Sequence, residues 1–135
     1  MEANDIIAKA REYVGTPFHH QGRQKGVGID CIGLLVCVAN DLGIKVIDRD
    51  GYGTMPYKGL LEQGLKENCE RITIPVPGCI VLIKFPNAHP SHVGIYTGEN
   101  IIHCWSQPGK CVEHIYSDKW KRLTVGYYRW PIHPR

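Results

Sequence analysis

Apolar residues near the start of the chain recur at intervals of three or four positions, which places them along one face of a helix. The residues of this face are Ile6, Ile7, Ala10, Tyr13 and Val14. Asn4 is well suited to cap such a helix, and Gly15 is well suited to end it. The sequence therefore predicts an amphipathic helix between Asn4 and Gly15.

A second apolar run begins directly after Cys31 and continues to Ala39. Its nearly continuous hydrophobic character predicts a buried helix that ends near residues 40–43. Because residues 16–28 have the composition of a loop, Cys31 is expected at or near the first turn of this helix. The unpaired backbone N–H groups and the positive dipole end found there favour a thiolate and lower the pKa of a cysteine. This placement suits a nucleophile.

Short apolar runs separated by turns follow in the second half of the chain, which is typical of strands. Strands are expected over residues 72–76, 79–83, 112–115 and 125–130, and around His92 and His103. A short helix is expected over residues 58–68, after an irregular segment over 48–56. Helices first and antiparallel strands afterwards indicate the α+β class. Since no repeat, low-complexity tract or linker divides the sequence, residues 1–135 are expected to form a single domain.

Two of the expected strands carry histidines and are separated by a turn-like segment, residues 97–100. A hairpin there would set the strands of His92 and His103 side by side, although contact between the rings depends on the register. A cysteine at a helix N-terminus, a histidine base and a second polar residue that orients the base form the general arrangement of thiol proteases. Cys31, His92 and His103 fit these three places.

Composition narrows the function classes. With 135 residues, 43% of them hydrophobic, the chain can build one core. The net charge of +3 is mild and most basic residues are scattered, so no nucleic-acid partner is expected. No apolar run approaches membrane-spanning length, and the N-terminus lacks the features of a signal peptide. The initiating methionine favours a complete chain, and the six spread cysteines suggest synthesis in a reducing cytoplasm without disulfides.

Three stretches of the chain agree in type, order and approximate spacing with one known family. They are GTPFHHQG at residues 15–22, GIDCIGL at residues 28–34, and SHVGIY at residues 91–96 followed by Ile102 and His103. On these motifs the chain resembles the NlpC family of papain-like cysteine peptidases, which cut bacterial cell-wall peptides. The sequence of residues 18–22 is most similar to sequences of the phage and prophage branch of this family. The resemblance implies a papain-like fold, with N-terminal helices packed on a C-terminal antiparallel sheet.

The resemblance also implies a role for each motif residue. Cys31 would be the nucleophile, His92 the general base, and His103 the residue that fixes the orientation of the base. Asp30 would contact the free amine of a stem peptide, although an aspartate here could equally be a helix cap. Both interpretations of Asp30 stay open at this point.

Further substrate contacts are expected around this centre. Relatives often carry an aromatic hydroxyl where this chain has Phe18, so His19 or His20 is a candidate for supplying a polar group. Ser91 and Trp105 are also expected to contact substrate, with Trp105 in the wall of the cleft. The remaining histidines, His89, His114 and His133, are expected at the surface.

The resulting hypothesis is a peptidoglycan hydrolase. The expected bond joins the γ-carboxyl of D-glutamate to diaminopimelate or lysine in a stem peptide, and it would be cut through a thioacyl-enzyme without a cofactor. The phage-like motif favours a tail-associated enzyme or a secreted toxin amidase, with phage tail or secretion-apparatus proteins as candidate partners. An alternative is a binding or structural protein without activity. A second alternative is a zinc module, because His103, Cys104, Cys111 and His114 offer two nitrogens and two sulfurs.

Overall fold

The computed structural model of the chain describes residues 2–48, 60–87 and 90–131. The helices are α1 (Ala3–Arg11), α2 (Cys31–Asp41), α3 (Leu60–Asn68) and α4 (Asp118–Leu123). The longer strands are β4 (Ile80–Lys84), β5 (Pro90–Tyr96), β6 (Asn100–Trp105), β7 (Lys110–Ile115) and β8 (Thr124–Arg129). The short strands are β1 (Arg23–Gln24), β2 (Gly28–Ile29) and β3 (Glu70–Ile72). None of the helices in these ranges has the length and apolar character needed to cross a lipid bilayer.

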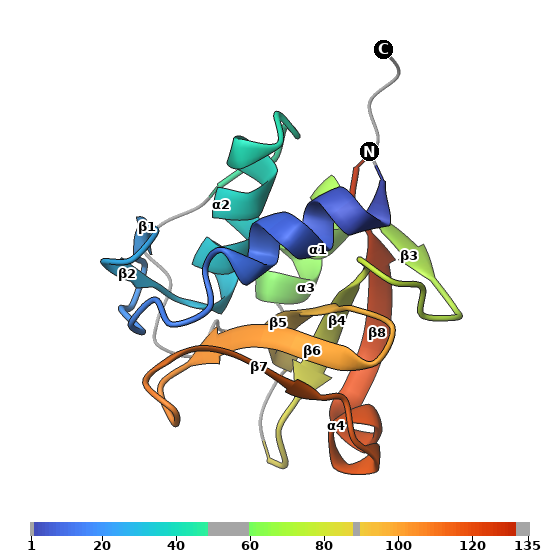
Figure 1. Cartoon of the computed structure of the whole chain (residues 1–135). Helices are drawn as coiled ribbons and strands as arrows, with labels where there is room; N and C mark the ends of the chain where they lie inside the picture. Colours follow the sequence, from blue (N-terminus) through green and yellow to red (C-terminus); the bar gives the residue numbers. More distant parts are fainter. Residues whose placement is uncertain (1, 49–59, 88–89, 132–135) are drawn as a thin grey trace.

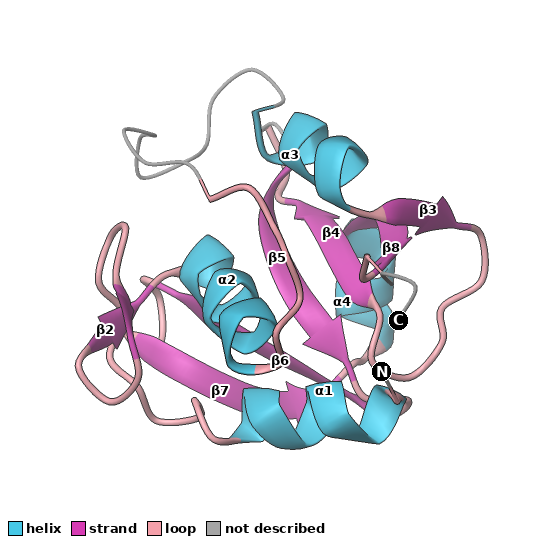
Figure 2. Ribbon diagram, turned by 90° about the horizontal axis from the view of Figure 1, so that it is seen from above, coloured by secondary structure: helices cyan, strands magenta, loops and turns pink. Residues whose placement is uncertain are grey.

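Six of the strands form one antiparallel sheet, in the order β3-β8-β4-β5-β6-β7. The helices α1, α2 and α3 lie over one face of this sheet (Figures 1 and 2). The expected α+β class, with N-terminal helices packed on a C-terminal antiparallel sheet, is therefore confirmed. β5 and β6 form the predicted hairpin, whose strands pair at Ile95–Ile102 and Tyr96–Ile101.

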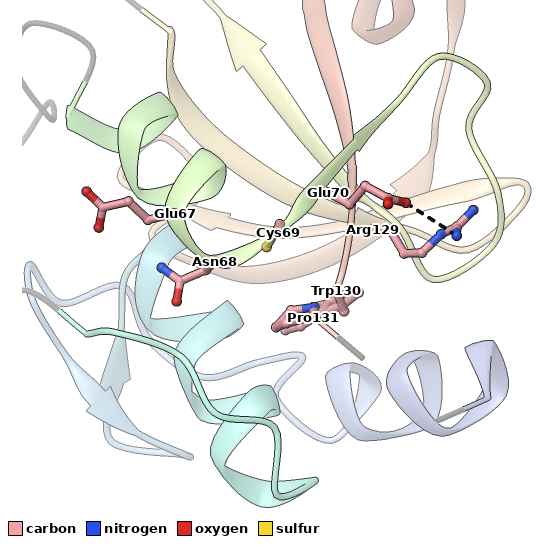
Figure 3. Close-up of a pocket in the computed structure, with 7 residues that line it drawn as sticks. All are labelled: Glu67, Asn68, Cys69, Glu70, Arg129, Trp130 and Pro131. Atoms are coloured by element: carbon pink, nitrogen blue, oxygen red, sulfur yellow. Dashed lines mark ion pairs between the residues drawn. The ribbon is translucent and has the colours of Figure 1, made fainter. Parts of the chain in front are cut away.

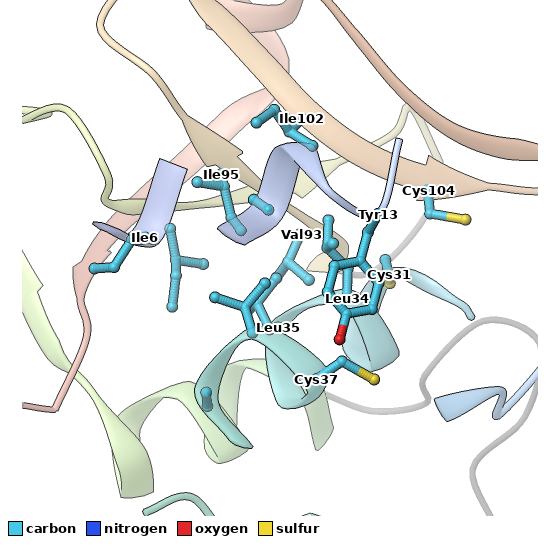
Figure 4. Close-up of a cluster of buried hydrophobic side chains, with 14 of the residues drawn as sticks. Ile6, Tyr13, Cys31, Leu34, Leu35, Cys37, Val93, Ile95, Ile102 and Cys104 are labelled. Atoms are coloured by element: carbon cyan, nitrogen blue, oxygen red, sulfur yellow. The ribbon is translucent and has the colours of Figure 1, made fainter. Parts of the chain in front are cut away.

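Alternation along the strands divides the buried side chains between two cores. Val93, Ile95 and Ile102 point toward the helices and join the larger core, part of which Figure 4 shows. Their sequence neighbours face the other way, where Val81, Ile83 and Ile101 pack with partly buried side chains of α4. The two histidine strands therefore carry core residues on both faces, so the direction of each histidine follows from its position in the alternation.

The helix α2 lies at the centre of the larger core. Leu34, Val38 and Ala39 have no exposed surface, which explains the unbroken apolar run in the sequence. The helix ends at Asp41, and Gly43 adopts the positive φ of 72° that lets the chain leave. Both ends of α2 agree with the prediction.

The first helix is shorter than expected. α1 ends at Arg11, and Asn4 lies inside it rather than at its cap, because Glu2 occupies that place. The backbone N–H of Glu2 donates to the carboxylate of Asp5 over 3.2 Å. Val14 lies beyond the helix with 44% of its surface exposed, so its assignment to the apolar face was wrong.

Two further local predictions differ from the structure, and one short helix was not predicted. The strand expected over 72–76 is β3, at Glu70–Ile72, because Pro75 and Pro77 lack the N–H that a ladder needs and Ile74 is 73% exposed. The segment expected as a loop over 16–28 contains the hairpin of β1 and β2. The short polar helix α4 gave no apolar pattern in the sequence. Most of the irregular segment expected over 48–56 lies outside the described residues.

Candidate active site

Asp30 caps the helix that begins at Cys31. Its Oδ1 accepts a hydrogen bond from the backbone N–H of Gly33 over 2.7 Å, and its Oδ2 accepts one from the N–H of Gln21 over 2.8 Å. The guanidinium of Arg23 lies 3.1 Å from Oδ1 and pairs with the carboxylate, and the side chain of Asp30 is 6% exposed. Asp30 therefore satisfies a helix N-terminus and anchors the preceding loop, as the helix-cap interpretation required.

Gly33 explains the spacing of the Asp-Cys-x-Gly motif. A Cβ at this position would collide with the backbone carbonyl of Gly22, which lies directly against the helix. The glycine thus lets the loop carrying Gly22 and Arg23 close over the first turn of α2. The same closure delivers the guanidinium of Arg23 to Asp30.

Cys31 is the first residue of α2, as predicted, and it is 8% exposed. Burial raises the pKa of the Cys31 thiol to about 12, and the adjacent carboxylate of Asp30 acts in the same direction. The backbone N–H groups of Val93 and Ile32 interact with the sulfur and favour the thiolate, but they do not outweigh burial. The expectation of a lowered pKa was therefore wrong, because removal from water dominates over the helix N-terminus.

The contact with Val93 places the thiol beside the residue that follows His92 in β5. The ring of His92 is 3% exposed, and its Nε2 lies 2.8 Å from Nδ1 of His103, a hydrogen-bonding distance. In the register set by the Ile95–Ile102 pair, the two histidines occupy the same sheet face at diagonal positions. The sequence placed both rings on neighbouring strands, and the register determines that they meet.

Gly94 makes room for this contact. It lies two residues after His92, on the same face of β5, next to the strand that carries His103. A Cβ on Gly94 would come within 2.9 Å of Ile101 Cδ1 and 3.1 Å of His103 Cβ. The glycine of the His-Val-Gly motif is therefore required for the side chain of His103 to lie across β5.

Burial controls the protonation of both rings. It lowers the pKa of His92 to about 3. It also lowers the pKa of His103 to about 2, where the neighbouring rings of His92 and His114 contribute in the same direction. Both histidines are therefore neutral near pH 7, and a neutral imidazole is able to accept a proton.

Aromatic side chains surround the histidine pair. The ring of Trp105 lies 4.2 Å from that of His103 and 5.4 Å from that of His92, measured between centroids. Phe85 contacts His92 at 5.6 Å, and Trp120 of α4 contacts His103 edge-on at 4.9 Å. No sequence pattern identified Phe85 or Trp120 as residues of the site. These rings limit the access of water to the hydrogen bond between the histidines.

His114 was expected at the surface, but it is only partly exposed and belongs to the site. Its Nε2 lies 2.7 Å from Nε2 of His103. The strand register explains this contact, because His114 stands opposite Ile101, on the same sheet face as His103. Cys104 and Cys111 stand opposite each other and point into the helix-side core. The four proposed zinc ligands thus lie on two faces of the sheet, so the zinc-module alternative was wrong.

Of the other expected substrate contacts, three lie in the loop before α2 and one lies in β5. Phe18 is half-buried against the larger core, and its backbone pairs with Ile29. His19 is exposed and His20 is half-buried, with His19 Nδ1 3.0 Å from the carbonyl oxygen of His20. Ser91 lies in β5 directly before His92, but its side chain is outside the described part of the structure.

A cleft of about 360 Å³ lies elsewhere, where the C-terminus of α3 meets the end of β8 (Figure 3). Cys69 and Trp130 line it, and Glu70 and Arg129 form an ion pair at 3.4 Å on its rim. None of its lining residues belongs to the histidine site.

The chain is similar to known proteins in sequence and in fold. The sequence profile described as the NlpC/P60 family matches residues 15–129. A structure of a protein similar to lipoprotein, of the NLP/P60 family, from Staphylococcus aureus has a TM-score of 0.70 at 19% identity, over 97% of this chain and 42% of the other. The NlpC/p60 domain of the peptidoglycan hydrolase SagA has a TM-score of 0.65 at 20% identity, over 96% of this chain and 99% of the other.

One similar structure is described as non-catalytic. RipD from Mycobacterium tuberculosis is a non-catalytic NlpC/p60 domain protein adapted to peptidoglycan binding, and it has a TM-score of 0.63 at 16% identity. The alignment covers 93% of this chain and 94% of RipD. The fold alone therefore does not distinguish hydrolases from binding proteins. An argument for hydrolysis must come from the side chains of the site.

Proposed function

The chain belongs to the NlpC/P60 family, and we propose that it is a cysteine peptidase that hydrolyses amide bonds in peptidoglycan stem peptides. The observation that carries the proposal is the buried hydrogen bond between His92 and His103, where the residue that follows His92, Val93, contacts the thiol of Cys31 through its backbone N–H. A general base must be a neutral imidazole in a fixed orientation, and the second ring can supply that orientation. The proposed catalytic residues are Cys31, His92 and His103.

The proposed reaction begins at the nitrogen of His92 that His103 does not occupy. Because Nε2 contacts His103, Nδ1 is the atom that takes the proton from the Cys31 thiol. The sulfur then bonds to the amide carbon, and the resulting oxyanion is stabilised by backbone N–H groups near the helix N-terminus. One such donor contributes about 3 kcal/mol in other proteases.

The remaining steps restore the starting protonation states of Cys31 and His92. His92 gives its proton to the leaving nitrogen as the C–N bond breaks, which releases the amine and leaves a thioester on Cys31. His92 then removes a proton from water as the water attacks the thioester carbon. The C–S bond breaks, the acid product leaves, and the thiolate regains its proton from His92. The first proton transfer, from Cys31 to His92, creates one negative and one positive charge, so it leaves the net charge of the two residues unchanged.

The reaction type is argued from the site residues, whereas the identity of the substrate bond rests on the motif resemblance. We take the bond between the γ-carboxyl of D-glutamate and diaminopimelate or lysine as the substrate, from the motif resemblance. Phe18, His19, His20, Ser91 and Trp105 are proposed to contact the stem peptide. Asp30 already accepts bonds from Gly33, Gln21 and Arg23, so a contact with the stem-peptide amine would add to its role as a cap. Attachment to a phage tail or secretion apparatus remains part of the proposal.

The test is a digestion of purified sacculi with the wild-type protein and with Cys31→Ala. The wild type is expected to release muropeptide fragments whose masses identify the bond, and the variant is expected to release none while keeping its folded circular dichroism spectrum. Turnover by Cys31→Ala would end the assignment. Binding of sacculi by the wild type without any released fragment would instead place the chain with proteins such as RipD.

A further inference from the structure

The hydrogen bonds between the histidines continue beyond the pair already described. His92 Nε2 lies 2.8 Å from His103 Nδ1, and His103 Nε2 lies 2.7 Å from His114 Nε2. His114 Nδ1 in turn lies 3.0 Å from the backbone carbonyl oxygen of Ile115. Three imidazoles from β5, β6 and β7 thus form one row that crosses the sheet and ends on a backbone atom.

The backbone atom at the end of the row determines where each proton lies. A carbonyl oxygen can only accept, so Nδ1 of His114 must carry a proton. In neutral His114 the other nitrogen, Nε2, is then an acceptor, and Nε2 of His103 must donate to it. Since neutral His103 now has its proton on Nε2, its Nδ1 accepts, and Nε2 of His92 must donate.

The consequence appears at the far end of the row. With its proton on Nε2, neutral His92 has an unprotonated Nδ1, which is the nitrogen a base needs. The opposite direction of the row would place a proton on Nδ1 of His92 and prevent it from accepting another. We propose that His114 is a positioning residue that, through the carbonyl of Ile115, fixes the tautomers of His103 and His92 in the form competent for catalysis. The catalytic part of this proposal rests on the proposed function, but the tautomers do not.

Neighbouring side chains hold the last ring of the row in place. The indole of Trp120 in α4 contacts the rings of both His103 and His114, at 4.9 and 5.5 Å between centroids. His103 has no exposed surface, so water does not compete for its Nε2. Without an acceptor at position 114, this nitrogen would be a buried donor without a partner, and the preference between the two tautomers would be lost.

The direct test is nuclear magnetic resonance of the histidine ring nitrogens in the ¹⁵N-labelled protein near pH 8, where no substrate is needed. Long-range proton–nitrogen correlations are expected to show the proton on Nδ1 of His114 and on Nε2 of both His103 and His92. A proton on Nδ1 of His92, or on Nε2 of His114, would overturn the proposal. This result stands whether or not the protein proves to be a hydrolase.

Two substitutions separate positioning from simple structural support. His114→Leu removes the acceptor, so His92 and His103 are expected to show mixed tautomers and kcat is expected to fall roughly 10-fold, with KM changed less than about twofold. His114→Gln keeps an acceptor oxygen and is expected to restore the wild-type tautomers and most of kcat. Lys110→Gln, at an exposed position of the same strand, is the control. Wild-type tautomers in His114→Leu, or no recovery in His114→Gln, would contradict the positioning role.

Discussion

The two buried histidines predict that the protein loses stability in mild acid. His92 and His103 keep pKa values of about 3 and about 2 in the folded chain, because burial disfavours their charged forms. In the unfolded chain both rings return to the ordinary value near 6.5. Below that pH the unfolded state binds protons that the folded state cannot bind, so stability falls as the pH falls from 6.5 toward 3.

The size of the loss follows from these values. Between pH 7 and pH 5, each histidine that protonates only in the unfolded state lowers the free energy of unfolding by about 2 kcal/mol. The two histidines together therefore cost about 4 kcal/mol. This is a large share of the 5 to 15 kcal/mol that holds a domain of ordinary stability together.

The assay is urea unfolding at pH 7, 6 and 5, with a variant that removes one of the two rings. His103→Asn keeps a polar group near the position of Nδ1 but does not titrate, so its loss of stability between pH 7 and 5 is expected to be about 2 kcal/mol smaller than that of the wild type. His19→Asn is the matched control, because the exposed ring of His19 meets water in both states. An equal pH dependence in wild type and His103→Asn would show that His103 is not buried in its neutral form.

Other substitutions test the site from different sides. His92→Ala is expected to reduce hydrolysis of sacculi nearly as much as Cys31→Ala, and His103→Ala less so; a wild-type rate in either variant would remove that residue from its proposed role. Gly94→Ala is expected to lower the free energy of unfolding by roughly 1 to 3 kcal/mol and to reduce kcat, since its Cβ would press on Ile101 and His103; unchanged stability and rate would refute this packing. Asp30→Ala is expected to lower the thermal midpoint through loss of about 2 kcal/mol, because a helix cap and a partner of Arg23 disappear together; a midpoint equal to that of the wild type would contradict the capping role.

Much of the site was predictable because its signals are local. The apolar run after Cys31 predicted α2, and the turn between two β-like segments predicted the hairpin that carries His92 and His103. His114 could not be assigned in the same way. Its contact with His103 depends on the register of β6 against β7, which residues far apart in the sequence determine together.

The pKa of Cys31 shows a different limit of sequence reasoning. A helix N-terminus favours a thiolate by a modest amount, and this part was visible in the sequence. The opposing cost depends on how completely the sulfur is removed from water, which only the packed structure determines. At Cys31 the effect of burial is larger than that of the helix N-terminus, so the pKa is raised rather than lowered.

Burial of both proposed partners is compatible with catalysis, because it penalises each single charge more than it penalises the pair. A thiolate alone or an imidazolium alone is unfavourable in this site, which is why the pKa of Cys31 is raised and that of His92 is lowered. Transfer of a proton from Cys31 to His92 changes no net charge, and the two new charges attract each other strongly where water is excluded. The same exclusion strengthens the hydrogen bonds by which His103 and His114 hold His92. In the proposed mechanism, pairing with His92 rather than free ionisation of Cys31 supplies the nucleophile, and that pairing requires Nδ1 of His92 to be unprotonated when substrate arrives.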